Sequence, residues 1–119
     1  MVTLYKMKYK IYLVPFPFDD LAGRKVRPTV CLTDPVGPYR HIVLAFITSR
    51  IPTNPLPTDL VIDSNDVGFA VTGLRVSSTL QVHRLMTATT SFLRRELGEL
   101  SPAMQEQVND RLRTLFALK

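Results

Sequence analysis

Cysteine, tryptophan and histidine are scarce in this sequence, and their scarcity excludes several kinds of site. Among 119 residues there are one cysteine, no tryptophan and two histidines. The single cysteine, Cys31, excludes an intramolecular disulfide and a metal cluster built from cysteines. His41 and His83 are far apart in the chain, and no phosphate-binding glycine loop, zinc motif or nucleophile elbow is present. We therefore expect neither a metal site nor a cofactor.

Long apolar segments are also missing. The longest one near the N-terminus, residues 11–18, is interrupted by Pro15 and Pro17 and is followed by no small-residue cleavage site. A membrane-spanning helix needs about 20 apolar residues, which no segment offers. We expect a cytoplasmic protein that does not cross a membrane.

The remaining composition is that of an ordinary globular protein with excess positive charge. Hydrophobic residues make up 45% and charged residues 21%. A chain of this length forms one domain, which we expect to cover residues 1–119. The formal net charge of +5 favours an anionic partner, either nucleic acid or an acidic protein.

The hydrophobic pattern predicts a mainly β fold that ends in a helix. Alternating or continuously apolar segments, bounded by turn residues, predict strands at residues 8–14, 28–33, 41–47, 59–63 and 75–85. Residues 8–14 alternate as in a half-buried strand, whereas residues 41–47 are apolar enough to be covered on both faces. Ser101 and Pro102 then favour the start of a helix, along which Met104, Val108, Leu112 and Leu115 form one apolar stripe. Short strands closed by one helix indicate an α+β fold around a small β-barrel.

Three places in the chain have residues that suit an anionic ligand. The first holds Arg24, Lys25 and Arg27 at a loop-to-strand junction, where Pro28 fixes the strand entry and orients the Arg27 guanidinium for bidentate phosphate binding. The cations at 24 and 25 fit a solvated loop equally well.

The second place follows the most apolar predicted strand, and the third lies within the last one. Thr48, Ser49 and Arg50 emerge from residues 41–47 and form either an anion pocket or a turn that satisfies local backbone groups. Alternation places Gln81 and His83 on one polar face, next to Arg84 in sequence. Histidine exchanges protons near neutral pH, although a lone strand histidine is more often structural than catalytic.

Several segments, in their order and spacing, carry a family resemblance over residues 10–118. The first segment is residues 11–23. It is followed by the cation Lys25, one spacer residue, Arg27-Pro28 and a hydrophobic strand. Residues 45–49, which end in Ile47-Thr48-Ser49, come next, and residues 73–75 and 94–102 continue the series into the terminal helix. This series resembles the MazF/PemK toxins of type II toxin–antitoxin systems.

The resemblance implies a small SH3-like or CcdB-like barrel that acts as a homodimer and as a metal-independent endoribonuclease. Such enzymes cut single-stranded mRNA at short sequences, leaving 2′,3′-cyclic phosphate and 5′-hydroxyl ends, and a cognate acidic antitoxin occupies the same groove. By this resemblance the predicted catalytic residues are Arg27 for charge stabilisation, Thr48 to orient the phosphate and His83 as proton carrier. The predicted RNA-binding residues are Arg24, Lys25, Ser49, Arg50, Gln81 and Arg84.

Departures from the family pattern leave a second hypothesis open. Some relatives carry an Arg-x-Asp pair where this chain has Gln81 and His83, and a glutamine where it has Arg50. The alternative is a barrel that binds antitoxin, RNA or, like CcdB, a topoisomerase without cutting RNA. A peptide-binding SH3-like module is less favoured, because such modules use aromatic grooves and only 8% of residues here are aromatic.

Overall fold

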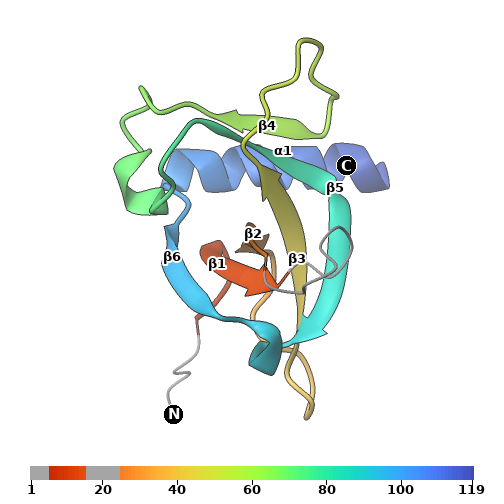
Figure 1. Ribbon diagram of the computed structural model, residues 1–119. Helices are drawn as coiled ribbons and strands as arrows, with labels where there is room; N and C mark the ends of the chain where they lie inside the picture. Colours follow the sequence, from red (N-terminus) through yellow and green to blue (C-terminus); the bar gives the residue numbers. More distant parts are fainter. Residues whose placement is uncertain (1–5, 16–24) are drawn as a thin grey trace.

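In the part of the chain that the structure describes, residues 6–15 and 25–119, six antiparallel strands form one curled sheet (Figure 1). This computed structural model contains β1 (Lys10–Pro15), β2 (Val26–Cys31), β3 (His41–Thr48), β4 (Asp59–Ile62), β5 (Ser78–Thr89) and β6 (Arg95–Glu99). Two 3-10 turns, η1 (Ala70–Thr72) and η2 (Thr90–Phe92), and the helix α1 (Pro102–Phe116) complete it. The strand order is β4-β5-β3-β2-β1-β6, so β4 and β6 are the edges. The predicted fold class, mainly β with one C-terminal helix and a small barrel, is confirmed, with the curled sheet forming a half-barrel.

Strands β1, β2 and β3 are covered on both faces. Along β3, Leu44 and Phe46 belong to one buried cluster, while Ala45 and Ile47 belong to another. The strand β1 does the same with Ile11 on one side and Tyr12 and Val14 on the other, all at most 9% exposed. The prediction for β3 is therefore confirmed, whereas the prediction that residues 8–14 form a half-buried strand is wrong, because a second layer of side chains covers the face of Tyr12.

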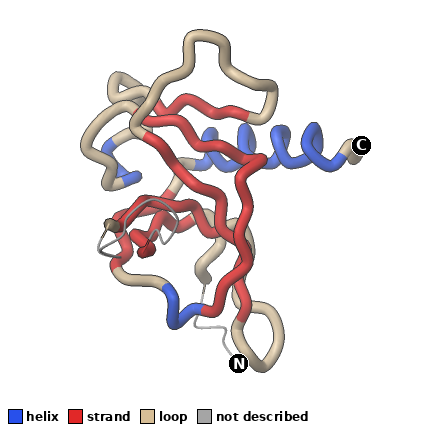
Figure 2. The backbone as a smooth tube through the Cα atoms, turned by 45° about the vertical axis from the view of Figure 1, so that its right-hand side comes forward, coloured by secondary structure: helices blue, strands red, loops and turns tan. Residues whose placement is uncertain are grey.

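The helix α1 covers one of these two faces. Ser101 caps it by accepting a hydrogen bond from the Met104 amide at 3.3 Å. Met104 and Val108 are buried in the larger cluster, and Leu112 and Leu115 pack against it, as the apolar stripe predicts. Figure 2 shows the helix crossing the strands at one end of the sheet. None of the described helices is long and apolar enough to span a membrane.

Strand β6 was not predicted, and its formation depends on two glycines. Its residues Arg95–Glu99 show no apolar alternation, so only the free edge of β1 brings them into the sheet. A Cβ on Gly98 would stand 2.2 Å from the Val71 carbonyl oxygen, and one on Gly73 would stand 2.1 Å from the Leu97 carbonyl oxygen. These reciprocal backbone contacts hold η1 and the segment after it against β6.

Replacing Gly98 by alanine should destabilise the fold. The new methyl group would meet backbone atoms that cannot rotate away, and we expect a loss of about 1–3 kcal/mol in the free energy of unfolding. Urea denaturation would measure it. Gly37→Ala is the matched control, because Gly37 has φ +75° but no atom within 4 Å of the added Cβ. It should lose only about 1 kcal/mol, from backbone strain alone. Equal losses in both variants would contradict the steric argument.

Cys31 and Tyr12 lie in the smaller buried cluster, at 0% and 9% exposure. Burial raises the pKa of the Cys31 thiol to about 11. Burial also raises the pKa of the Tyr12 phenol to about 12, with a smaller contribution from the nearby Glu96 carboxylate. Both groups stay protonated at neutral pH, so Cys31 behaves as the buried hydrophobic residue expected from the sequence.

These raised pKa values predict a loss of stability in alkali. At neutral pH both groups are almost fully protonated in the folded and the unfolded state. Above pH 9 the unfolded thiol ionises while the folded thiol, with its pKa near 11, does not, so the free energy of unfolding should fall as pH rises. Urea denaturation at pH 7 to 10.5 would measure the slope, which Cys31→Ala should reduce. Tyr12→Phe should reduce it further at the upper end of that range, unlike the control Tyr39→Phe at an exposed position. Identical slopes in all variants would contradict this account.

Candidate functional site

A cavity of about 1100 Å³ opens on the sheet and is lined from all six strands. Its described lining includes one carboxyl group, that of Asp59, against five arginines: Arg27, Arg50, Arg75, Arg84 and Arg95. Among the described residues, no three His, Cys, Asp or Glu side chains gather as a metal site. Such a concentration of guanidinium groups favours an anionic ligand.

Arg27 and Thr48 come together on neighbouring strands. The register pairs Thr29 of β2 with Phe46 of β3, and two residues further along each strand lie Arg27 and Thr48. A step of two residues returns to the same face of a sheet, so both side chains share the face of the Thr29 and Phe46 pair. Both are half-buried and both line the cavity. The sequence predicted both residues for the site, and the fold brings both into the lining of the cavity.

The turn after β3 is held by hydrogen bonds to both backbone groups of Arg50, its amide and its carbonyl. The Arg50 amide donates to Thr48 Oγ1 at 3.2 Å, and the Arg50 carbonyl accepts from Thr79 Oγ1 at 2.8 Å. Thr48 therefore does satisfy a local backbone group, but the bond uses an acceptor position and leaves its hydroxyl hydrogen to donate. Ser49 and Arg50 line the cavity as well. The two readings of this corner, turn and anion pocket, are compatible.

A bulge in β5 changes which residues face the cavity. Ala45 pairs with Leu85 but Phe46 pairs with Gln81, so three extra residues of β5 fall between successive pairs. Leu80 and Val82 both belong to the larger buried cluster, so the predicted alternation, with Gln81 and His83 on the opposite face, holds up to His83. The extra residues bring Arg84 to the cavity beside Gln81, and Arg84 Nη1 donates to Gln81 Oε1 at 3.4 Å.

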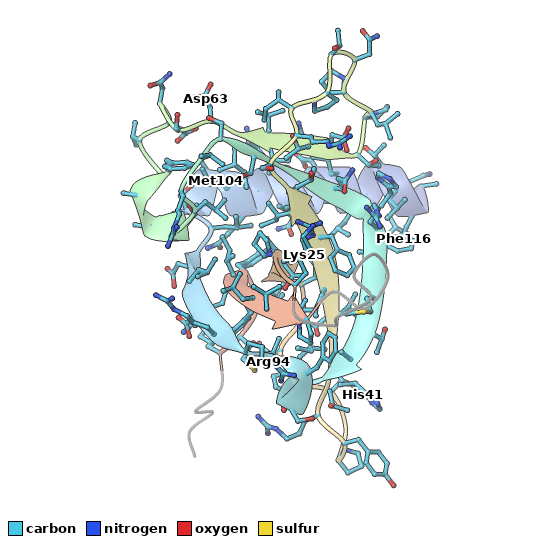
Figure 3. All side chains as sticks on the ribbon, in the orientation of Figure 1. Lys25, His41, Asp63, Arg94, Met104 and Phe116 are labelled. Atoms are coloured by element: carbon cyan, nitrogen blue, oxygen red, sulfur yellow. The ribbon has the colours of Figure 1, made fainter. Side chains whose placement is uncertain are left out.

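His83 lies outside the cavity lining. It is exposed, and its Nδ1 is 3.3 Å from the Thr58 hydroxyl. Lys25, seen in the middle of Figure 3, is exposed and is also absent from the lining, whereas His41 lies at the end remote from α1. Arg24 lies outside the described residues.

The lining residues that were not predicted for the site include Phe46, Asp59, Arg75 and Arg95. Phe46 and Asp59 read as core and strand-end residues, and only the strand order brings Asp59 of β4 to the cavity. Arg75 follows Gly73, whose positive φ turns the chain along β6 and carries Arg75 into the wall. Arg75 and Arg95 belong to segments that resembled the family, which was the one signal the sequence offered.

Comparison with known proteins agrees with this architecture. The family model described as PemK-like, MazF-like toxin of type II toxin–antitoxin system matches residues 7–116. The chain belongs to this toxin family. No match is found among curated proteins compared by sequence.

Solved structures share the fold at low sequence identity. The Mycobacterium tuberculosis toxin MazF-mt6 is 22% identical, with a TM-score of 0.68 over 92% of this chain and 98% of that one. A mycobacterial endoribonuclease in complex with its cognate antitoxin is 20% identical, with a TM-score of 0.68 over 96% and 97%. A MazE–MazF structure from Deinococcus radiodurans is 16% identical, with a TM-score of 0.67 over 98% and 100%. The predicted PemK/MazF fold is thus confirmed.

The arginines of the lining should govern the salt dependence of binding to a single-stranded nucleic acid. Each lost phosphate contact lowers the slope of log affinity against log salt by about 0.7 for single strands. We therefore expect Arg95→Gln to weaken binding of an oligonucleotide without 2′-hydroxyls and to reduce that slope by about this amount. Fluorescence anisotropy at several salt concentrations would measure both. Arg113→Gln is the control, because Arg113 lies on α1 paired with Asp110. The same slope for wild type and Arg95→Gln would contradict the assignment.

Proposed function

We propose that this PemK/MazF-family chain is the toxin of a type II toxin–antitoxin system that cuts single-stranded RNA in the arginine-lined cavity. The observation that carries the proposal is the placement of Arg27 and Thr48 on adjacent strands, on one face, in that cavity. Solved relatives with this fold include an endoribonuclease, which supports the same class of reaction.

The chemistry follows from what these side chains offer. The 2′-hydroxyl of the RNA attacks the adjacent phosphorus, a 2′-O–P bond forms, the P–O5′ bond breaks, and the hydroxyl proton leaves as the 5′-oxygen gains one. The products are a 2′,3′-cyclic phosphate and a 5′-hydroxyl end. Arg27 neutralises the negative oxygens of the crowded transition state and is too basic to act as proton carrier. Thr48 donates its hydroxyl hydrogen to a phosphate oxygen and orients it.

His83 is not carried over as proton carrier. A general base must reach the proton that it takes, directly or through one water. His83 does not line the cavity and its Nδ1 faces Thr58. The proposal therefore assigns phosphate binding and charge stabilisation to named residues and makes His83 a test position.

The same cavity also suits an acidic antitoxin segment. Five lining arginines attract carboxylates as well as phosphates. Relatives have been solved with their antitoxins, in the mycobacterial and Deinococcus structures. We include an antitoxin that competes with RNA, a homodimeric toxin and a cytoplasmic location, where mRNA is found, in the proposal.

A binding protein without catalysis is the alternative. Gln81 favours it: some relatives carry a cation at this position, and the uncharged amide of Gln81 cannot transfer a proton in the reaction. In that case the cavity would hold RNA or antitoxin without cleavage.

Cleavage of a mixed-sequence RNA in EDTA, with the new ends identified chemically, would test the proposal. We expect 5′-hydroxyl and cyclic phosphate ends. Arg27→Gln should lower the rate by about 100-fold or more, as loss of a transition-state donor does. Thr48→Val should lower it by about tenfold, the effect of one hydrogen bond to a charged group.

His83→Gln serves as the matched control on the neighbouring strand. It should retain the wild-type rate within about threefold, because its side chain lies outside the lining. Wild-type chain that binds RNA but leaves it intact would support the binding alternative. Loss of cleavage in His83→Gln, with binding preserved, would restore the histidine as proton carrier.

A further inference from the structure

One carboxyl group lies in a wall made of arginines, and one of its oxygens lacks a partner. Asp59 is 8% exposed and lines the cavity. Its Oδ2 accepts a hydrogen bond from the Leu56 amide at 2.9 Å. Within the described residues, its buried Oδ1 has no hydrogen-bond partner. Buried polar groups are nearly always paired, so this oxygen marks a place where a donor belongs.

The position of Asp59 in the sheet is defined by a row of paired residues. Asp59 of β4 pairs with Gln81 of β5, and Gln81 pairs with Phe46 of β3. Directly paired residues point to the same face with Cβ atoms about 5 Å apart. The carboxyl, the amide and the aromatic ring therefore stand next to one another across three strands.

Arg84 adds a flat cation to this row because of the bulge in β5. Its guanidinium carbon lies 5.7 Å from the centre of the Phe46 ring, and it lines the cavity. Arginine planes and aromatic rings are the groups on which proteins stack unpaired RNA bases. Gln81 Oε1 accepts from Arg84, which leaves the Gln81 amide nitrogen to donate elsewhere.

The row is chemically unsuited to phosphate. A carboxylate repels a phosphate and instead accepts from N–H groups, as Asp and Glu do from the amino group of cytosine. Phosphate binding belongs to Arg27 and Thr48, which lie two residues further along β2 and β3 on the same face. Two residues of a strand span about 7 Å, a reach that one nucleotide covers between its phosphate and its base edge.

Building on the RNA cleavage proposed above, we propose that Asp59, Gln81 and Arg84 form a subsite for one unpaired base whose Watson–Crick edge carries an exocyclic amino group next to an accepting ring nitrogen, as in adenine or cytosine but not guanine, whose neighbouring ring nitrogen is a donor. The base stacks on the Arg84 guanidinium, its amino group donates to Asp59 Oδ1, and Gln81 donates to the neighbouring ring nitrogen. Uracil lacks the amino group and leaves the carboxyl oxygen unpaired. This subsite makes cleavage selective at one position of the RNA.

Sequencing the 5′-hydroxyl ends produced from a randomised RNA library tests the subsite. The wild-type chain should prefer adenine or cytosine over uracil by about tenfold or more at one position, the discrimination that a specific base contact gives. Asp59→Asn should reduce the preference at that position to below about threefold. Asp63→Asn is the matched control, since Asp63 is exposed, lies just after β4 and is absent from the lining. It should keep the wild-type preference at every position.

A second variant guards against a folding defect at Asp59. Gln81→Met keeps the side-chain volume and removes the amide, and it should weaken the preference at the same position. Thermal unfolding shows whether each variant is folded. The proposal is overturned if folded variants at both positions keep the wild-type preference.

Binding separates this inference from the cleavage on which it builds. Oligonucleotides without 2′-hydroxyls cannot be cut, and their affinities with adenine, cytosine or uracil can be compared by anisotropy. If the chain binds these oligonucleotides but does not cut RNA, the cleavage proposal is wrong and the affinities decide the base subsite. Tighter binding of adenine or cytosine than of uracil, with a smaller difference in Asp59→Asn, supports the subsite. Equal affinity for all three bases overturns the subsite even where cleavage is observed.

Discussion

Strand β3 pairs along its whole length with β5, and one irregularity in that pairing positions much of the cavity. Between the pairs Ala45–Leu85 and Phe46–Gln81 the long strand gains three residues. The extra length bends β5 and changes the face of each side chain that follows. Arg84 thereby comes beside Gln81 and Phe46.

The two faces of the sheet serve different purposes. One is sealed by α1, whose buried residues Met104 and Val108 complete the larger hydrophobic cluster. The other is covered by the smaller cluster around Leu44 and Cys31 at one end, and at the other end it carries the arginines of the cavity. Burying the central strands on both faces anchors a rigid frame. The exposed guanidinium groups of the lining then repel one another only through water, which screens them.

The cavity contains two kinds of chemistry on one face. Arg27 and Thr48 offer a charge and a hydroxyl to a phosphate, while the neighbouring row offers an acceptor, an amide and a stacking plane. Phosphate contacts hold any strand in place, whereas contacts to base edges distinguish sequences. Because the rows are set by the register of β2, β3, β5 and β4, both functions depend on the same backbone.

Local patterns in the sequence were enough to predict the mainly β fold and the capped helix at Ser101. Both follow from short segments: alternating apolar residues, a helical stripe and an N-cap. The roles of Arg27 and Thr48 came from the family resemblance and stay predictions. The resemblance of ordered segments to the PemK/MazF toxins added the family, which the match over residues 7–116 shows.

The remaining features needed the tertiary structure. Strand β6 has no hydrophobic alternation and exists because β1 offers an edge and because Gly73 and Gly98 allow backbones to touch. The place of Arg84 beside Phe46 could not be predicted from alternation, because alternation is a property of one strand, whereas a bulge is decided by the strand beside it. Asp59 entered the cavity only because β4, which precedes β5 in the chain, pairs with it at the edge of the sheet. Sequence alone thus determined which cationic and polar side chains this protein has for an anionic ligand. The packing of β-strands that are distant in the sequence decided which of these side chains meet in one cavity.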